Sequence, residues 1–394
     1  MRSGRDSADD PAIPAPPAPR ANPDLAGHEA AESALRHLFQ SGRLPHALLL
    51  SGPRGIGKAT LAFRLARFVL ANGVALANGA GEGAPGGLFG DDGVDPGDFG
   101  ETGLAISPDS GVFRRVASGG HADLLTVERA YDPRRRRLRG EIIVEDTREI
   151  GTFLRLTPAE GGWRVVVVDG ADEMNRSAAN ALLKILEEPP RRVLLLLVAH
   201  SPGRLLPTIR SRCRRFPLAP LAPGVVRLLL QRNRPDLPEP QAEALTALAG
   251  GSIGRALDLA GAGGVELYEA VLALLSRDGG IDPVALHAFA DRLARSEAEE
   301  AYRAVEELVT QLLARLAVAA ARGREGREPQ PTREAGVVQR LSLRAPAARW
   351  AALRDEIGRS FARTDALNLD RKQTILGAFF AISGAFFANS GATR

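Results

Sequence analysis

The sequence predicts an α/β fold with a mostly parallel sheet, followed by an all-helical remainder. Two observations predict it: short apolar runs of strand length occur only in the first half, and helical patterns separate them. The strand-like runs are Leu48–Leu50, Leu124–Val127, Val165–Val168 and Val193–Val198. The helical stretches are Ala59–Ala71, Asp146–Leu156 and Asn175–Glu187, the last with Asn175 as N-cap and Pro189 just beyond its end. Strands that alternate with helices imply crossover connections, which give parallel pairing.

Composition divides the 394 residues into four expected regions. Residues 1–23 are rich in proline and cannot bury enough apolar surface to fold, so we expect a disordered tail. Residues 24–217 form the α/β domain, and its glycine-dense stretch 72–122 is expected to be an irregular insertion or mobile loop. Short helices are expected over 218–263. Longer helices are expected within 264–394, at Val265–Leu275, Pro283–Ser296, Glu299–Ala321, Gly336–Thr364 and Asp370–Phe387.

Charge and cysteine content narrow the function classes. The net charge is only +4 despite a pI near 9.7, and nearly all basic residues are arginine, which favours a compositional bias over a dedicated DNA-binding face. Cys213 is the only cysteine, so disulfides within the chain and all-cysteine zinc sites are excluded, and we expect a cytoplasmic protein. The longest apolar run, Ile375–Phe387, is shorter than the roughly 17–25 residues that span a bilayer, so no membrane segment is expected.

A phosphate-binding loop is predicted at Ser51–Thr60, directly after a strand and before a helix. Glycines in such a loop let backbone N–H groups curl around phosphates, and Lys58 supplies positive charge for the terminal phosphates. This strand–loop–helix context makes the motif specific. The candidate nucleotide-binding residues here are Gly52, Gly55, Gly57, Lys58 and Thr60.

One position of this loop departs from the motif. A P-loop carries Ser or Thr directly after the lysine, because that hydroxyl ligates Mg²⁺, and this chain has Ala59 there. Thr60 lies one residue further on, about 100° around the helix, so it is not expected to reach the same ligand position. We therefore expect nucleotide binding to survive and magnesium-assisted hydrolysis to be impaired.

The second motif is an apolar strand that ends in an acid, the Walker B pattern. Its acid is Asp169, which is placed to hold the water shell of a metal ion. A glutamate that polarises the attacking water normally follows, and this chain has Gly170 instead. Asp172 and Glu173 remain as alternative sources of that carboxylate, although both lie beyond the strand. Two catalytic positions are therefore blank, which indicates that hydrolysis is not required of this chain.

A third stretch carries a family resemblance. Asn180–Pro190 and Leu206–Cys213, taken with the P-loop, resemble the AAA+ subunits of bacterial DNA clamp loaders. Ser211-Arg212-Cys213 resembles the Ser-Arg-Cys signature of that family. The resemblance implies that Arg212 is an arginine finger, donated into the ATP site of the neighbouring subunit. A planar, always-charged guanidinium suits that role.

Within the family, the likeness is to the delta-prime subunits of DNA polymerase III, which are poor or absent ATPases. It is carried by His121–Glu128, by Ala159–Arg164 and by the two blank positions. It implies that 24–217 is the AAA+ domain, 218–263 a helical lid and 264–394 a collar that holds a ring. The implied partners are tau/gamma and delta subunits in a hetero-pentameric ring, the sliding clamp and primer-template DNA. No polymerase active site is implied in this chain.

The resemblance also implies details of ligands. Gly250–Leu257 matches the sensor 2 segment, with Arg255 at the nucleotide-contacting position; the alternative is an ordinary helix start after a glycine turn. The expected nucleotide is ATP with Mg²⁺, bound weakly or not hydrolysed. Many relatives carry a four-cysteine zinc module between the P-loop helix and Walker B. Residues 72–122 lack cysteine, so the insertion replaces that module and no zinc is expected.

Other interpretations stay open beside this one. The chain is alternatively an ATP-hydrolysing motor subunit of the tau/gamma type, against which Ala59 and Gly170 argue, or a P-loop kinase, which leaves the helical half unexplained. The arginine run Arg134–Arg137 is expected at a hairpin tip, either solvated or in contact with DNA phosphates. His200, which follows a strand near the sensor 1 position, is interpreted as structural.

Overall fold

The computed structural model describes residues 16–77, 103–132, 137–160, 162–277, 280–323 and 333–387. They form two compact units. The first runs to Pro235 and also includes Gly250–Gly254, and the second comprises Asp236–Ala249 and the chain from Arg255 onward. The division therefore passes through residues 218–263, which the sequence resemblance treats as a single lid.

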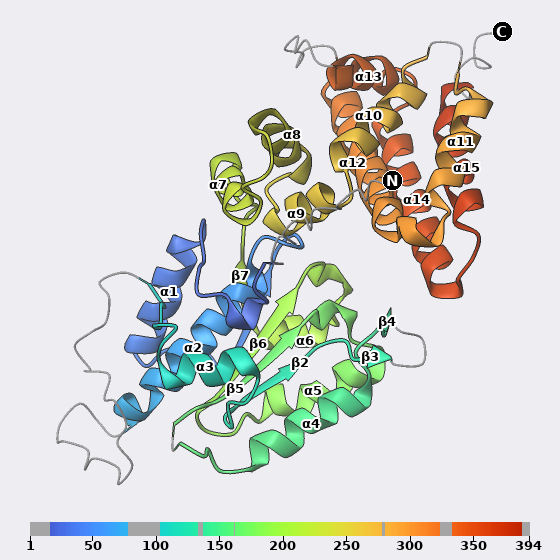
Figure 1. Cartoon of the computed structure of the whole chain (residues 1–394). Coiled ribbons are helices and arrows are strands. Elements are labelled where there is room, and N and C mark those ends of the chain that lie inside the picture. The colour runs from blue at the N-terminus through green and yellow to red at the C-terminus, as the bar shows by residue number, and fades with distance from the viewer. Residues whose placement is uncertain are drawn as a thin grey trace, which may run out of the picture. The chain divides into compact units, whose positions relative to one another are not determined.

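The first unit is built on a five-stranded sheet (Figure 1). Its strands are β1 (Ala47–Ser51), β2 (Leu124–Val127), β5 (Arg164–Asp169), β6 (Val193–Ala199) and β7 (Arg214–Pro217). Their spatial order is β2–β5–β6–β1–β7, and every neighbouring pair is parallel. The predicted parallel α/β fold is confirmed. β7 lies outside the predicted runs, because the exposed Arg214 and Arg215 interrupt the apolar pattern on this edge strand.

Helices cover both faces of this sheet. On one face, Leu49, Val166 and Leu195 join a buried cluster with residues of α4 (Val144–Arg155), α5 (Arg176–Glu187) and α6 (Pro207–Arg212). On the other, α2 (Lys58–Ala77) contacts β1, β5 and β6. Successive residues of a strand point to opposite faces. Strands covered on both sides therefore carry continuous apolar runs, which is why the sequence reveals them.

The insertion expected at 72–122 is partly regular, contrary to the prediction. α2 extends to Ala77, and α3 (Gly111–Ser118) folds within the stretch. Ser110 caps α3 by accepting a hydrogen bond from the Phe113 N–H at 3.1 Å, and Gly119 ends it in a left-handed conformation. Residues 78–102 lie outside the described residues.

The tail expected at 1–23 also differs in its second part. Residues 1–15 lie outside the described residues, but Pro19–Ala21 form a short 3-10 helix, η1. Buried Arg67 of α2 donates to the carbonyl oxygens of Arg20 and Asn22 at 2.8 and 2.9 Å. These contacts order a proline-rich segment that composition alone assigns to disorder. The next helix, α1 (Glu29–Gln40), packs on α2.

Two further elements of the first unit bear on the predictions. β3 (Tyr131–Asp132) and β4 (Arg137–Leu138) pair antiparallel, which confirms the hairpin; its tip at 133–136 lies outside the described residues. Asn175 caps α5 as predicted, since its Oδ1 accepts from the Ala178 N–H at 2.9 Å. α7 (Pro223–Asn233) completes this unit's helices among the described residues.

The described part of the second unit is all-helical. Its helices are α8 (Glu239–Ala249), most of α9 (Ile253–Gly261), α10 (Gly264–Leu275), α11 (Pro283–Leu293), α12 (Glu299–Arg322), α13 (Arg333–Ser342), α14 (Ala347–Leu367) and α15 (Arg371–Phe387). The rings of Tyr302 and Phe361 pack in a tilted arrangement between α12 and α14, with centroids 5.2 Å apart. Phe379 is buried against Phe289, as expected for core packing, whereas its neighbour Phe380 is 52% exposed. None of the described helices is both long and apolar enough to cross a membrane.

One helix prediction in this unit is wrong. The stretch Gly336–Thr364 is not one helix but parts of α13 and α14, which are separated at residues 343–346. Pro346 is the N-cap of α14. Proline has no N–H to donate to the preceding turn and disfavours helical geometry in the residue before it, so the helix restarts there.

The environment of Glu306 on α12 predicts that the free energy of unfolding depends on pH. Burial, with the nearby charges of Asp365 and Glu307, raises its pKa to about 7, and Arg303 only partly opposes this. The folded-state pKa lies above the unfolded one, so the ionised carboxylate destabilises the fold. This penalty begins as pH rises above the ordinary glutamate pKa and is complete above pH 7.

We therefore expect Glu306→Gln to stabilise the protein relative to wild type as pH rises from 5 to 8, by up to about 2 kcal/mol. Chemical unfolding at both pH values measures this. Glu300→Gln, at an exposed position of the same helix, is the control and should leave the pH profile unchanged. A stability difference between Glu306→Gln and wild type that is constant with pH would contradict the prediction.

Candidate functional site

The candidate site lies at the carboxyl edge of the parallel sheet. β1 and β5 both pair with β6, so that Ser51 is in register with Ala199 and Asp169 with Val198. The P-loop joins the end of β1 to α2, which begins at Lys58, so the N–H groups of the first helical turn face the loop. This edge holds all the predicted nucleotide residues of the first unit: Gly52, Gly55, Gly57, Lys58, Thr60 and Asp169.

Lys58 is a desolvated cation in the loop. Its side chain is buried and its Nζ donates to the Pro53 carbonyl oxygen at 2.5 Å. Burial lowers the Lys58 pKa to about 8, while the charges of Asp169 and Asp172 oppose that shift. Burial and the nearby Glu128 raise the pKa of Asp169, and Lys58 opposes that rise. A buried ammonium with few compensating charges is suited to bind an anionic phosphate.

The P-loop backbone is packed against the predicted sensor 2 segment. Ser252 is fully buried, and its Oγ donates to the Arg54 carbonyl oxygen at 2.8 Å. The Gly254 N–H donates to the Gly55 carbonyl oxygen at 3.0 Å. A Cβ on Gly55, whose φ is +75°, would lie 2.4 Å from Ser252 Oγ and 3.0 Å from Gly254 Cα. Glycine at 55 therefore serves this close approach, and Ser252 is a site residue that sequence reasoning missed.

Arg255 follows this contact directly. Its guanidinium forms an ion pair with Glu307 of α12, and Nη1 donates to the Ala249 carbonyl oxygen at 3.2 Å. Both partners belong to the same compact unit as Arg255. Its predicted role as a nucleotide contact stays a prediction.

The backbone after Asp169 explains the missing glutamate. Gly170 is left-handed, with φ 80° and ψ 44°, and leads into the 3-10 turn η2 (Ala171–Glu173). A Cβ at this position would lie 2.7 Å from Glu173 Oε2. A side chain here meets both an unfavourable backbone conformation and a close carboxylate. The position is thus shaped for glycine and not merely lacking an acid.

The two acids that follow are committed elsewhere. Asp172 is buried and accepts hydrogen bonds from the N–H groups of His200 and Ser201 at 2.9 and 2.8 Å. Glu173 forms an ion pair with Arg129, whose Nε lies 2.8 Å from Oε2. Neither carboxylate is available to polarise water at the end of β5. The alternative that Asp172 or Glu173 replaces the missing glutamate therefore finds no support in the structure.

His200 occupies the end of β6. Its Nδ1 is buried without a hydrogen-bond partner. Burial, reinforced by the charge of Lys58, lowers the pKa of His200 to about 4. The imidazole is therefore neutral at neutral pH and adds no positive charge to the phosphate site.

The predicted finger lies apart in sequence, at the carboxyl end of α6. The Arg212 side chain is 36% exposed, and its Nη2 lies 2.8 Å from Oε1 of Glu187, the last residue of α5. Its Nη1 donates to the Thr208 carbonyl oxygen at 3.0 Å. Cations are favoured at a helix carboxyl terminus, where backbone carbonyls lack partners. The finger role needs a neighbouring subunit and stays a prediction.

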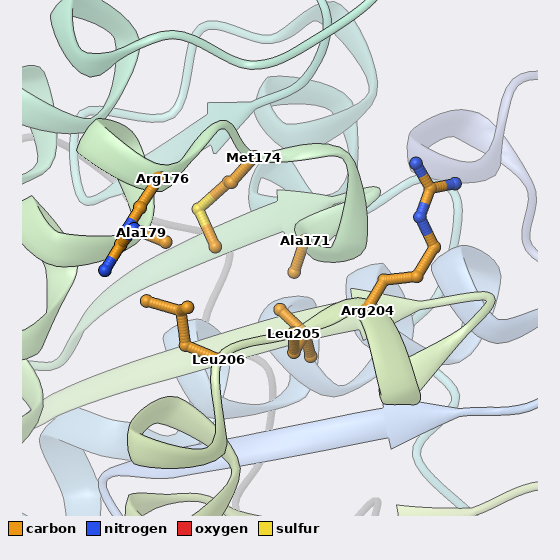
Figure 2. Close-up of a pocket in the computed structure, with 7 residues that line it drawn as sticks. All are labelled: Ala171, Met174, Arg176, Ala179, Arg204, Leu205 and Leu206. Carbon is orange, nitrogen blue, oxygen red and sulfur yellow. The ribbon is translucent and has the colours of Figure 1, made fainter.

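A shallow pocket of about 270 Å³ lies elsewhere on the first unit (Figure 2). Its lining comes from the start of α5 and the loops around it: Ala171, Met174, Arg176, Ala179, Arg204, Leu205 and Leu206. In Figure 2 the Arg204 guanidinium extends away from the apolar side chains. None of the predicted nucleotide residues lines the pocket, so it is not the phosphate site.

Across the ranges that the structure describes, no group of three or more His, Cys, Asp or Glu side chains is arranged to hold a metal ion. Cys213 is buried, and burial raises its thiol pKa to about 11. The expectation of no zinc stays a prediction.

Comparisons with known proteins agree with these motifs. The family described as "DNA polymerase III, delta subunit" matches residues 106–222. The DNA polymerase III subunit delta' of Pseudomonas aeruginosa is 37% identical over 61% of this chain and 64% of its own length. The DNA polymerase III subunit tau of Salmonella typhimurium is 30% identical over 82% of this chain and 43% of its own length. The chain thus spans less than two thirds of either relative.

One solved structure aligns with most of the chain. The DNA polymerase III gamma subunit-related protein from Thermotoga maritima aligns with 89% of this chain and 99% of that chain, at 18% identity. The TM-score is 0.33.

The shape of the Gly170 turn makes a prediction about stability and activity. We expect Gly170→Ala to lower the free energy of unfolding by about 1–2 kcal/mol, because a left-handed conformation costs about that much for a residue with a Cβ. The control is Gly151→Ala on α4, where nothing lies within 4 Å of the added Cβ. It should raise stability by about 0.5–1 kcal/mol. Urea unfolding measures both changes.

The geometry of the Gly170 turn also predicts the result of an attempt to restore ATP hydrolysis. Ala59→Thr combined with Gly170→Glu supplies both missing groups in sequence, but we expect no gain of ATP turnover, because the left-handed backbone at Gly170 disfavours a side chain and the added Cβ would have to displace the Glu173 carboxylate. Magnesium-dependent turnover by the double variant would show that the turn readily rearranges and would contradict this prediction.

Proposed function

We propose that this chain, a clamp-loader subunit of the delta-prime type by its family match and its relatives, activates a neighbouring ATPase subunit and does not hydrolyse ATP efficiently itself. One observation carries the proposal: the phosphate-binding loop and Lys58 are intact, whereas the left-handed Gly170 stands where the glutamate is expected and the next two acids are engaged elsewhere. A site built in this way has the means to bind phosphates and lacks the glutamate that normally follows the Walker B acid.

The proposed ligand is ATP, with Mg²⁺ held less well than in an active ATPase. Backbone N–H groups of the loop and the buried Lys58 would contact the phosphates, and Asp169 would face the metal water shell. Ala59 lacks the hydroxyl that ligates Mg²⁺ in active P-loop enzymes. Nucleotide bound here would serve as a structural ligand that stabilises the folded subunit.

The proposed activity lies in Arg212. An arginine finger stabilises negative charge on the transferring phosphoryl group, and it acts from outside the site that holds the nucleotide. The Arg212 guanidinium is partly exposed at the end of a short helix, and core residues on either side, Ile209 and Cys213, fix that helix to the first unit. An arginine presented in this way is suited to reach a site on another subunit.

The remaining assignments follow from the family. The proposed partners are tau/gamma and delta subunits in a hetero-pentameric ring, the sliding clamp, and primer-template DNA, with the process being DNA replication. The helices from α10 to α15 are proposed as the collar that holds the ring. The proposed domain division is AAA+ domain, lid and collar, with a cytoplasmic location.

An ATPase assay on the purified chain distinguishes the proposed function from the alternative, a tau/gamma-type motor subunit. We expect the purified chain to show negligible ATP turnover at saturating ATP and Mg²⁺, because Ala59 and Gly170 stand where the hydroxyl and the glutamate of an active site are expected. Turnover of the order of 1 per second or more, the range of competent enzymes, would favour the motor instead. Nucleotide binding measured in parallel tells an inactive site from an empty one.

The finger role predicts a loss of activity in the assembled loader. Arg212→Ala should leave the chain folded and assembled, because a partly exposed arginine contributes little to stability. It should lower the DNA-stimulated ATPase rate of the reconstituted loader and its clamp loading. Fingers are worth about 10³–10⁵ in turnover in GTPases, and one finger among several sites in a ring should show less.

Two further variants sharpen that experiment. Arg212→Lys should rescue poorly, because an ammonium lacks the planar fork of a guanidinium. Arg214→Ala removes an exposed arginine on the edge strand β7 and should leave the rate near wild type. If Arg212→Ala assembles and both ATPase and loading are unchanged, Arg212 is an ordinary surface arginine.

A further inference from the structure

We propose that Glu187 is a positioning residue for Arg212, holding its guanidinium in the orientation in which it enters the neighbouring ATP site. The inference rests on the proposed function of Arg212 and goes beyond it by naming the residue that orients the finger. Sequence reasoning assigns Glu187 no role beyond its place in the family-like stretch Asn180–Pro190.

The contact joins the carboxyl ends of two helices. Glu187 is the last residue of α5, and Arg212 is the last residue of α6. The guanidinium is held from two directions, with Nη2 2.8 Å from Glu187 Oε1 and Nη1 donating to the Thr208 carbonyl oxygen at 3.0 Å. Nη1 also lies 3.5 Å from the Ser211 hydroxyl. Contacts from two directions fix the plane of the group as well as its position.

Core packing fixes both helix ends beneath this contact. Leu186, which precedes Glu187, and Cys213, which follows Arg212, belong to the same buried cluster. The Leu186 carbonyl oxygen accepts a hydrogen bond from His46 Nε2 at 3.2 Å, which ties the end of α5 to the residue before β1. The carboxylate that meets Arg212 is therefore presented by a rigid support and not by a mobile loop.

A rigid support beneath Arg212 would favour its proposed role as an arginine finger. An arginine side chain has many rotamers, and fixing it only when the ring closes would cost conformational entropy at that step. Holding it beforehand removes that cost, and a guanidinium has more N–H donors than these contacts use. Glu187 is about half exposed, at 49%, so solvent screens its charge and leaves the guanidinium able to stabilise phosphate charge.

The test is a double-mutant cycle in the reconstituted loader with primed DNA. Glu187→Ala should lower the DNA-stimulated ATPase turnover at saturating ATP by about two- to fivefold, the range expected for an exposed ion pair. Glu187→Gln should retain most of the rate, because the amide oxygen still accepts a hydrogen bond from the guanidinium. Glu188→Ala is the matched control, at an exposed acid one residue away, and should match wild type.

Measuring Glu187→Ala in the Arg212→Ala background shows whether Glu187 acts through Arg212. If Glu187 acts through Arg212, Glu187→Ala lowers the rate in the wild-type chain and has no further effect once Arg212 is alanine. An equal loss in both backgrounds, an unchanged rate or an increased rate in the wild-type background each overturns the positioning role. If Arg212→Ala itself changes nothing, the proposed function fails, and that result is distinct from a cycle in which only Glu187 proves silent.

Discussion

The register of three buried parallel strands is the constraint on which the candidate site depends. β6 lies between β1 and β5, which sets Ser51 and Asp169 beside neighbouring residues at its end. A slip of one residue would turn the side chains of a strand to the opposite face, so burial of Val and Leu on both faces holds the P-loop in place. The candidate phosphate site is therefore supported by the core.

The two acids that follow β5, Asp172 and Glu173, have structural roles. Asp172 satisfies two backbone N–H groups where β6 ends, and Glu173 neutralises Arg129 beyond β2. In an active ATPase a carboxylate here must stay uncommitted until water and nucleotide arrive. In this chain the carboxylates of Asp172 and Glu173 already have hydrogen-bond or ion-pair partners, which favours a structural role over a catalytic one. The activity proposed for the chain depends instead on Arg212, on a different helix.

Sequence patterns predicted the parts of this molecule that depend on local residues. The buried strands, the P-loop and the N-cap at Asn175 follow from short-range apolar runs, spacing and capping chemistry. β7 escaped prediction because its arginines give no apolar pattern, and it becomes a strand only by pairing with β1. The pairing of Glu173 with Arg129, the packing of Ser252 on the P-loop and the Glu187–Arg212 contact join residues distant in the chain. No local pattern encodes those contacts.

The turn at Gly170 also makes the present state difficult to leave by mutation. A glutamate at position 170 would meet a left-handed backbone and the Glu173 carboxylate. Hydrolysis would further require a hydroxyl in place of Ala59 and the release of Glu173 from Arg129. We expect no catalytic gain from any one of these steps alone, and a loss of stability from the Gly170 step. If the proposed function holds, a gain of hydrolysis would require several changes together, and the Gly170 geometry would make the non-hydrolysing state difficult to reverse.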